Sequence, residues 1–235
     1  MKTLYLLLNL GSLSIPFLYS FHPKLKFYNY WKALFPSILI TMCIFIPWDV
    51  LFTEHKIWGF NESYFMGFSW FGLPIEEWLF FICIPYACVF THFALLHYFP
   101  KAKLSKKTTQ RVSLLLCILF FSILMFNTDK WYTAINFLYA IVLIPIVSKY
   151  NSELLSKYYL TFLVMLIPFF LVNGVLTGSW IPDEVVWYNN NENLGIRLFT
   201  IPIEDSIYAF TLILSNLFLT HLFMNKKAPE YSEAF

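Results

Sequence analysis

Seven stretches of this chain are apolar over about the length that a helix needs to cross a bilayer, roughly 20 residues for a hydrocarbon core about 30 Å thick. They are residues 3–21, 33–52, 73–98, 112–126, 131–148, 158–177 and 201–224. Composition agrees, because 59% of the residues are hydrophobic and only 13% are charged, whereas an average soluble domain carries about 25%. The sequence therefore predicts an all-α integral membrane protein with seven transmembrane helices.

Basic residues are concentrated in the segments that seven spans would put on one side of the membrane. Residues 22–32, 99–111, 149–157 and 225–235 together hold twelve of the sixteen Lys and Arg residues. Because cytoplasmic loops are enriched in these residues, we expect a multi-pass protein of the cell (inner) membrane with its N-terminus outside and its C-terminus in the cytoplasm. The formal net charge of +2 gives no support for a nucleic-acid partner.

The chain contains an internal repeat. A shift of 128 residues brings residues 57–82 over 185–210 without a gap, and the identical pairs include Pro74 with Pro202. A shift of four spans keeps the orientation, so we expect two parallel repeats related by an axis along the membrane normal. The predicted units are a first three-helix repeat at 1–98, a linker with helix four at 99–130, a second three-helix repeat at 131–224, and a C-terminal tail at 225–235.

Each repeat places two adjacent acids at the start of an apolar run. They are Glu76 and Glu77 in the first repeat, and Glu204 and Asp205 in the second. An acid in the first turn stabilises a helix by up to about 1 kcal/mol. That capping interpretation explains one acid well, but it does not explain paired acids at matching positions. Ionisable groups inside a membrane cost at least about 2.5 kcal/mol each at the bilayer centre and mark functional sites.

These four acids are the predicted catalytic residues. Neighbouring residues on a helix point about 100° apart, so the identical pair Glu76 and Glu204 is the first choice, and Glu77 and Asp205 are in support. Two carboxyls held close in an apolar site cannot both ionise, so one is expected to keep its proton, although a helix N-terminus favours the charged form. Such a pair supplies a general acid beside a general base.

The remaining inventory narrows the chemistry. The sequence has no dinucleotide-binding, phosphate-loop, H-E-x-x-H or nucleophile-elbow motif, and its five histidines lack ligand spacing, so no cofactor and no metal site is predicted. Acid–base chemistry on a hydrocarbon fits instead, because aromatic faces stabilise a carbocation that water would quench. Aromatic candidates near the motifs are Trp58, Phe80, Trp187 and Tyr208, for each of which lipid-facing packing is the alternative.

The two motifs resemble those of a known family. Residues 73–77 and 201–205 resemble the paired Pro-x-Glu-(Glu/Asp) motifs of the heterodimer-type lycopene cyclases of bacteria, archaea and fungi. Residues 173–178, 186–189 and 195–197 are similar to the segment that precedes the second motif. The resemblance covers nearly the whole chain, and the two halves, which can be separate subunits in that family, look fused through helix four.

The resemblance implies a lycopene β-cyclase, which closes the open ends of lycopene into β-ionone rings without net redox change, forming β-carotene via γ-carotene. By this resemblance, Glu76 and Glu204 correspond to the motif glutamates, and Glu77 and Asp205 correspond to the acid that follows. Further substrate-binding candidates are Asp49, Asn173 and Arg197. The sequence leaves open which carboxyl is the acid, which carotenoid ends react, and whether the repeats share one site.

Expected partners are a lipophilic polyene substrate and membrane lipid, and self-association or association with other carotenoid enzymes is left open. Two other interpretations compete with a cyclase. One is a small-solute or proton-coupled transporter, because small sugar transporters also have a three-one-three parallel arrangement and intramembrane carboxylates carry protons. The other is a scaffold for carotenoid enzymes.

Overall fold

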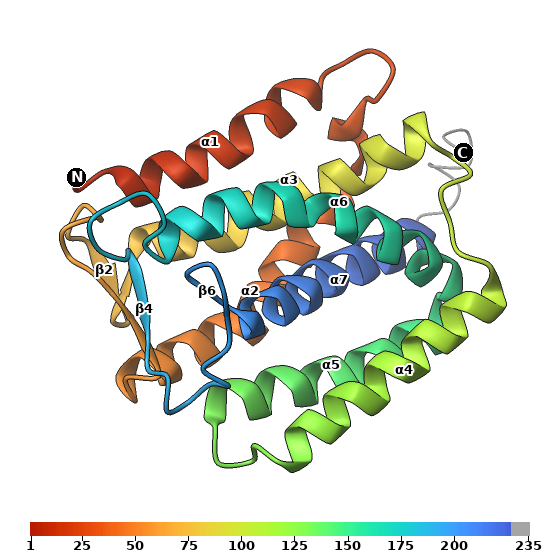
Figure 1. Cartoon of the computed structure of the whole chain (residues 1–235). Helices are drawn as coiled ribbons and strands as arrows, with labels where there is room; N and C mark the ends of the chain where they lie inside the picture. Colours follow the sequence, from red (N-terminus) through yellow and green to blue (C-terminus); the bar gives the residue numbers. More distant parts are fainter. Residues whose placement is uncertain (227–235) are drawn as a thin grey trace.

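The computed structural model describes residues 1–226 of the chain, and all but the start of the expected tail at 225–235 lies outside the described residues. Its helices are α1 (Leu4–Tyr19), η1 (Phe27–Tyr30, a short 3-10 helix), α2 (Trp31–Glu54), α3 (Ile75–Tyr98), α4 (Lys106–Met125), α5 (Trp131–Tyr150), α6 (Ser152–Leu176) and α7 (Ile203–Lys226) (Figure 1). Within the described residues, six long helices and the shorter α1 thus overlap the seven apolar stretches of the sequence.

Six of these helices are long and apolar enough to cross a membrane, as judged over the described residues, and they are α2 to α7. Helix α1 is apolar but has 16 residues, which at 1.5 Å per residue is about 24 Å and shorter than a hydrocarbon core. The protein is therefore membrane-embedded, with six helices of spanning length and a shorter seventh one.

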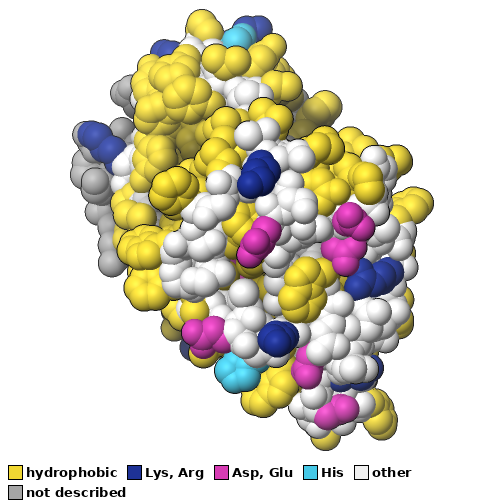
Figure 2. Space-filling view, turned by 90° about the vertical axis from the view of Figure 1, so that its left-hand side faces the viewer, with side chains coloured by type: hydrophobic (Ala, Val, Ile, Leu, Met, Phe, Trp, Pro, Cys, Tyr) yellow, Lys and Arg dark blue, Asp and Glu magenta, His cyan; other side chains and the backbone are white. Residues whose placement is uncertain are grey.

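Short strands at one end of the helices were not predicted from the sequence. They are β1 (Trp58–Phe60), β2 (Ser69–Trp70), β3 (Leu73–Pro74), β4 (Val186–Tyr188), β5 (Arg197–Leu198) and β6 (Ile201–Pro202). The all-α expectation is incomplete in this respect, because strands of two or three residues show no alternating pattern and form only when their partner is in place. This end of the molecule carries charged side chains of both signs among apolar ones (Figure 2), as expected for a face outside the hydrocarbon.

The strands form the same hairpin before α3 and before α7. In the first repeat β2 pairs with β3, and in the second β5 pairs with β6. The backbone at Phe71 and at Phe199 has a positive φ, 51° and 57°, as tight hairpin turns require. The prolines end β3 and β6, so each helix starts one residue later, at Ile75 and Ile203. The hairpin thereby fixes where the acidic pair begins its helix.

The two halves of the chain pack into each other. Helix α1 packs on α3 and α5 packs on α7, whereas α2 packs on α7 and α6 on α3. Strand β1 pairs antiparallel with β4, with Gly59 opposite Trp187, two positions that the repeat relates to each other. The second long helix of each half, α2 or α6, thus packs against the acidic helix of the other half. This packing brings both acidic motifs to one region.

Candidate active site

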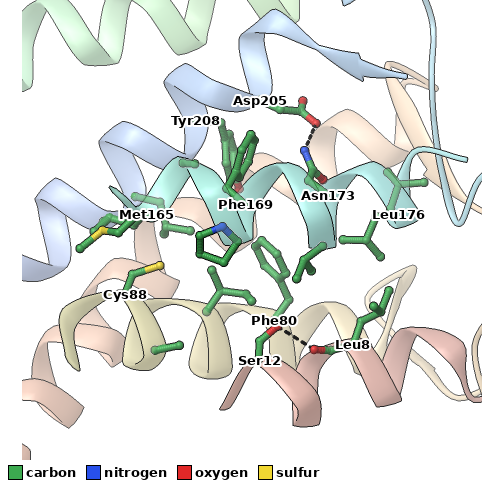
Figure 3. A pocket seen from close by; sticks show the side chains of 18 of the residues that line it. Leu8, Ser12, Phe80, Cys88, Met165, Phe169, Asn173, Leu176, Asp205 and Tyr208 are labelled. Atoms are coloured by element: carbon green, nitrogen blue, oxygen red, sulfur yellow. Dashed lines mark hydrogen bonds between the residues drawn. The ribbon is translucent and has the colours of Figure 1, made fainter. Parts of the chain in front are cut away.

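A cavity of about 510 Å³ lies among α1, α3, α6 and α7 (Figure 3), and it extends from Tyr5 and Asp205, near the strands, along the helices to Pro16 and Thr91. Its walls are mainly apolar and aromatic, and its polar groups include three carboxyls and one amide: Asp49, Glu77, Asp205 and Asn173. The volume is in the ordinary range for a small-molecule site, roughly 300–1,000 Å³. All four residues are candidates named from separate parts of the sequence, and the fold brings them to a single cavity.

The first repeat contributes two carboxyls to the same cavity. Asp49 of α2 and Glu77 of α3 are both buried, with 2% and 8% of their surfaces exposed, and both line the cavity close enough to influence each other's charge. Two carboxyls held close in an apolar site cannot both ionise, so the pair is most stable when it shares one proton. The Trp58 indole N–H donates to Asp49 at 2.7 Å, and the Tyr5 hydroxyl donates to Glu77.

The second repeat contributes a carboxyl whose two oxygens are both occupied. Asp205 accepts hydrogen bonds from the Tyr132 hydroxyl at 2.6 Å, the Asn173 amide at 2.8 Å and the Tyr188 hydroxyl at 3.0 Å. Burial, and then the neighbouring Asp205, raise the pKa of Tyr188 well above its ordinary value of 10.0, so this hydroxyl keeps the proton that it donates. Three donors fix the orientation of the Asp205 carboxyl toward the cavity.

The first acid of each motif lies outside the cavity lining. Glu76 accepts from the Met66 backbone N–H at 2.8 Å, and Glu204 accepts from the Leu194 backbone N–H at 2.7 Å. Glu204 also accepts from the Thr133 hydroxyl at 2.7 Å. The structure therefore does not bring Glu76 and Glu204, the first-choice catalytic pair predicted from the sequence, into the cavity lining. Because adjacent helix residues point about 100° apart, only one acid of each pair can reach the cavity, and it is the second.

The aromatic candidates divide into two groups. Trp58, Phe80 and Tyr208 line the cavity as expected. Trp187 does not; its ring packs on Gly59 across the β1–β4 pair, so close that a Cβ on that glycine would lie 2.4 Å from it. Arg197 also lies outside the lining, since its guanidinium donates to the Thr200 carbonyl at 2.6 Å and the Asn190 side chain at 2.8 Å.

Sequence reasoning missed the residues that hold the acids in place. Tyr5 and Tyr132 donate to the second acid of their own repeats, while Asn9 and Asn136 donate to the backbone carbonyls of Glu76 and Glu204, both at 2.7 Å. The signal was present in the sequence as a Tyr-x-x-x-Asn pattern that recurs after 127 residues, one fewer than the shift that aligns the motifs. One turn of α1 and one turn of α5 thus make equivalent hydrogen bonds to the acidic motif of their own half.

The cavity reaches the outer surface of the helices. Leu7 and Ile15 of α1 line it and yet are 60% and 65% exposed, and α1 and α6 contact each other at few points. The cavity therefore opens sideways, between apolar side chains, onto the surface that would face lipid. Within residues 1–226 no group of three or more His, Cys, Asp or Glu side chains is placed to hold a metal ion.

One family of known proteins matches both halves of the chain. The family model described as lycopene cyclase matches residues 2–95 and 129–223, one segment in each half of the chain. This chain belongs to the lycopene cyclase family. In the lycopene cyclase match, the unmatched interval between the two segments contains α4, the helix that joins the halves.

A curated relative whose name includes lycopene cyclase matches part of the chain. Over 56 residues the chain is 30% identical to the bifunctional lycopene cyclase/phytoene synthase of Aspergillus oryzae (strain ATCC 42149 / RIB 40), a match that covers 24% of this chain and 10% of the relative. The matched region is thus a small part of that protein's length. No solved structure matches the chain.

Proposed function

We propose that this lycopene cyclase family member is a lycopene β-cyclase that converts the open ends of lycopene into β-ionone rings, giving β-carotene via γ-carotene. The observation that carries the proposal is the convergence of three buried carboxyls, Asp49, Glu77 and Asp205, on one apolar cavity that opens toward lipid. An entrance on the lipid-facing surface is not accessible to a water-soluble substrate. A polyene dissolved in the membrane can insert one end through it.

Cyclisation needs one proton in and one proton out. A protonated carboxyl gives its proton to the terminal double bond, and the resulting carbocation is attacked by the nearby internal double bond, which closes the six-membered ring. Loss of a ring proton to a carboxylate then regenerates a double bond. Since one proton is added and one removed, the product is an isomer of the substrate, and the reaction consumes no oxidant or reductant.

The Asp49–Glu77 pair suits the role of general acid, because a shared proton is available at the cavity wall. Asp205 suits the role of carboxylate, since its oxygens already accept three hydrogen bonds that stabilise negative charge there. The two roles fall on separate groups with different environments, which is the pattern that distinguishes an acid from a base within one site.

The walls of the cavity suit a cationic intermediate. Trp58, Phe80, Tyr188 and Tyr208 present aromatic rings to the same space as the acids. Aromatic faces attract a cation by roughly 0.5–2 kcal/mol or more when water is excluded. We assign Glu76 and Glu204 to positioning, because each ties its helix start to the preceding loop.

We also propose an arrangement of the helices in the membrane. We infer two parallel three-helix repeats at 1–98 and 131–224, joined through 99–130, with seven spans in the cell membrane. The distribution of Lys and Arg supports an outer N-terminus and a cytoplasmic C-terminus. The strand end and the three cavity carboxyls would then lie toward the outer side.

The decisive experiment supplies lycopene to membranes that contain the protein, in H₂O and in D₂O. The absorption spectrum should shift as rings form, and in D₂O each ring should carry one solvent deuterium, seen by mass spectrometry of the extracted pigment. Unchanged lycopene would contradict the proposal and favour a transporter or a scaffold. Rings without deuterium would contradict the carboxyl as proton source.

A further inference from the structure

The two repeats offer two grooves that the internal repeat relates to each other, and only one of them contains the cavity. The first groove lies between α1, α3 and α6, and the second lies between α5, α7 and α2. The matching hydrogen bonds of Tyr5 and Tyr132 align α1 with α5. The acid-facing positions Asp49 and Asn173 align α2 with α6.

The side chains at matching places differ in size. Ser12 lines the cavity, and its counterpart 127 residues on is Tyr139. Val172 also lines the cavity, and its counterpart 124 residues earlier is Trp48. In both cases the first groove has the small residue and the second groove has the large one.

The large residues fill the second groove. Phe45 packs against Tyr139 and Tyr208 with ring centroids 5.4 and 5.2 Å apart, and Trp48 packs against Tyr208 at 5.1 Å. The Tyr139 hydroxyl is hydrogen-bonded to Ser215 at 2.9 Å, which fixes the ring in that position. Aromatic rings at these separations are in contact, so the second groove is a packed core where the first is open.

The acids are distributed with the same asymmetry. The first repeat has two buried carboxyls in the cavity lining, Asp49 and Glu77, a pair that can share a proton. The second repeat has Asn173 at the matching place, so its acid, Asp205, is paired with an amide that has no acidic proton to give. The proton-sharing pair therefore exists once, and it faces the open groove.

We propose that this protein has a single reaction groove, bounded by Ser12 and Val172, through which the two ends of the polyene must pass one after the other. The inference rests on the proposed cyclisation. Each ring closure takes one proton from the Asp49–Glu77 pair and gives one proton to Asp205, so the groove gains and loses none. Transfer of that proton from Asp205 back to the pair readies the groove for a second end without any co-reactant. The one-ringed carotenoid has to leave the groove and re-enter with its open end first.

The test replaces the small wall residues by their large counterparts. In membranes supplied with lycopene, Ser12→Tyr and Val172→Trp should each lower one-ring and two-ring products together, by about 100-fold, the loss expected when a substrate no longer sits in place. Ser14→Tyr, the same exchange at an exposed position of α1 outside the cavity lining, and Tyr139→Phe, which keeps the second groove filled, should keep wild-type product ratios. Protein abundance in the membrane is measured for every variant.

A time course with the wild-type protein gives an independent readout that requires no substitution. With lycopene in molar excess, free one-ring carotenoid should accumulate beyond the amount of protein before the two-ring product dominates. Two-ring product without that accumulation, or one-ring product persisting in an abundant Ser12→Tyr or Val172→Trp variant, would overturn the single groove. Wild-type membranes that form no rings at all would instead overturn the proposed function.

Discussion

Asp49 and Glu77 place their carboxyls in the wall of the same cavity although they come from different helices, α2 and α3. Each is also held by an aromatic donor, Trp58 for Asp49 and Tyr5 for Glu77. The pair therefore has a fixed geometry at the cavity wall before any substrate enters. A preorganised acid of this kind avoids the cost of reorienting groups during the reaction.

Glu77→Gln and Asp49→Asn should each remove most of the cyclase activity. Loss of a general acid or base lowers a rate by about 100-fold to 10,000-fold, and the amides keep the size of the side chains. The readout is the pigment profile of lycopene-producing cells. Glu62→Gln, at an exposed loop position, is the matched control. Wild-type cyclisation in both cavity variants would remove the pair from the mechanism.

Tyr188→Phe should weaken cyclisation without abolishing it. The substitution removes one of three donors to Asp205, and a hydrogen bond to a charged group contributes about 1.5–3 kcal/mol, which corresponds to roughly a 10-fold to 100-fold lower rate. Tyr98→Phe, which changes an exposed tyrosine at the end of α3, serves as the control. A larger loss than that of Asp205→Asn would mean that Tyr188 has a role other than holding this carboxyl.

Glu76→Gln and Glu204→Gln separate positioning from chemistry. Glutamine retains an oxygen that can accept from the Met66 or Leu194 N–H, so we expect activity within a few-fold of wild type. Alanine at either position removes the acceptor of the part-buried Met66 or Leu194 N–H, which costs up to about 1–3 kcal/mol and should lower the thermal unfolding midpoint in detergent. Complete loss of cyclisation in an abundant, folded Gln variant would assign that glutamate to the reaction itself.

Gly59→Ala should destabilise the contact between the two halves. The added Cβ would lie 2.4 Å from the Trp187 ring, so β1 and β4 must separate or the ring must move; overpacking of this kind costs about 1–3 kcal/mol. The measurement is the thermal unfolding midpoint in detergent. Gly11→Ala, where a Cβ meets nothing within 4 Å, is the comparison and should not lower the midpoint. Equal midpoints for both variants would show that the β1–β4 contact is loose.

Sequence reasoning identified the four acids but not which of them share a site. Glu76 and Glu204 are the identical pair, and identity drew attention to them. Their carboxyls, however, bind loop N–H groups at the start of α3 and α7. The helix start has to be known to within one residue to say which of two adjacent acids faces inward, and that start is fixed by hairpins too short to be read from the sequence.

The sequence by itself determined the membrane class, the repeat and the residue types of the site, because apolar length, self-similarity and acids in a lipid-phase segment are properties of the chain alone. The tertiary structure decided that Asp49 meets Glu77, that Asp205 meets Tyr188, and that one of two related grooves is open. Those outcomes depend on how each half packs its second long helix against the other half. Small differences in side-chain volume, such as Ser12 against Tyr139, then decide whether a groove is filled or left free.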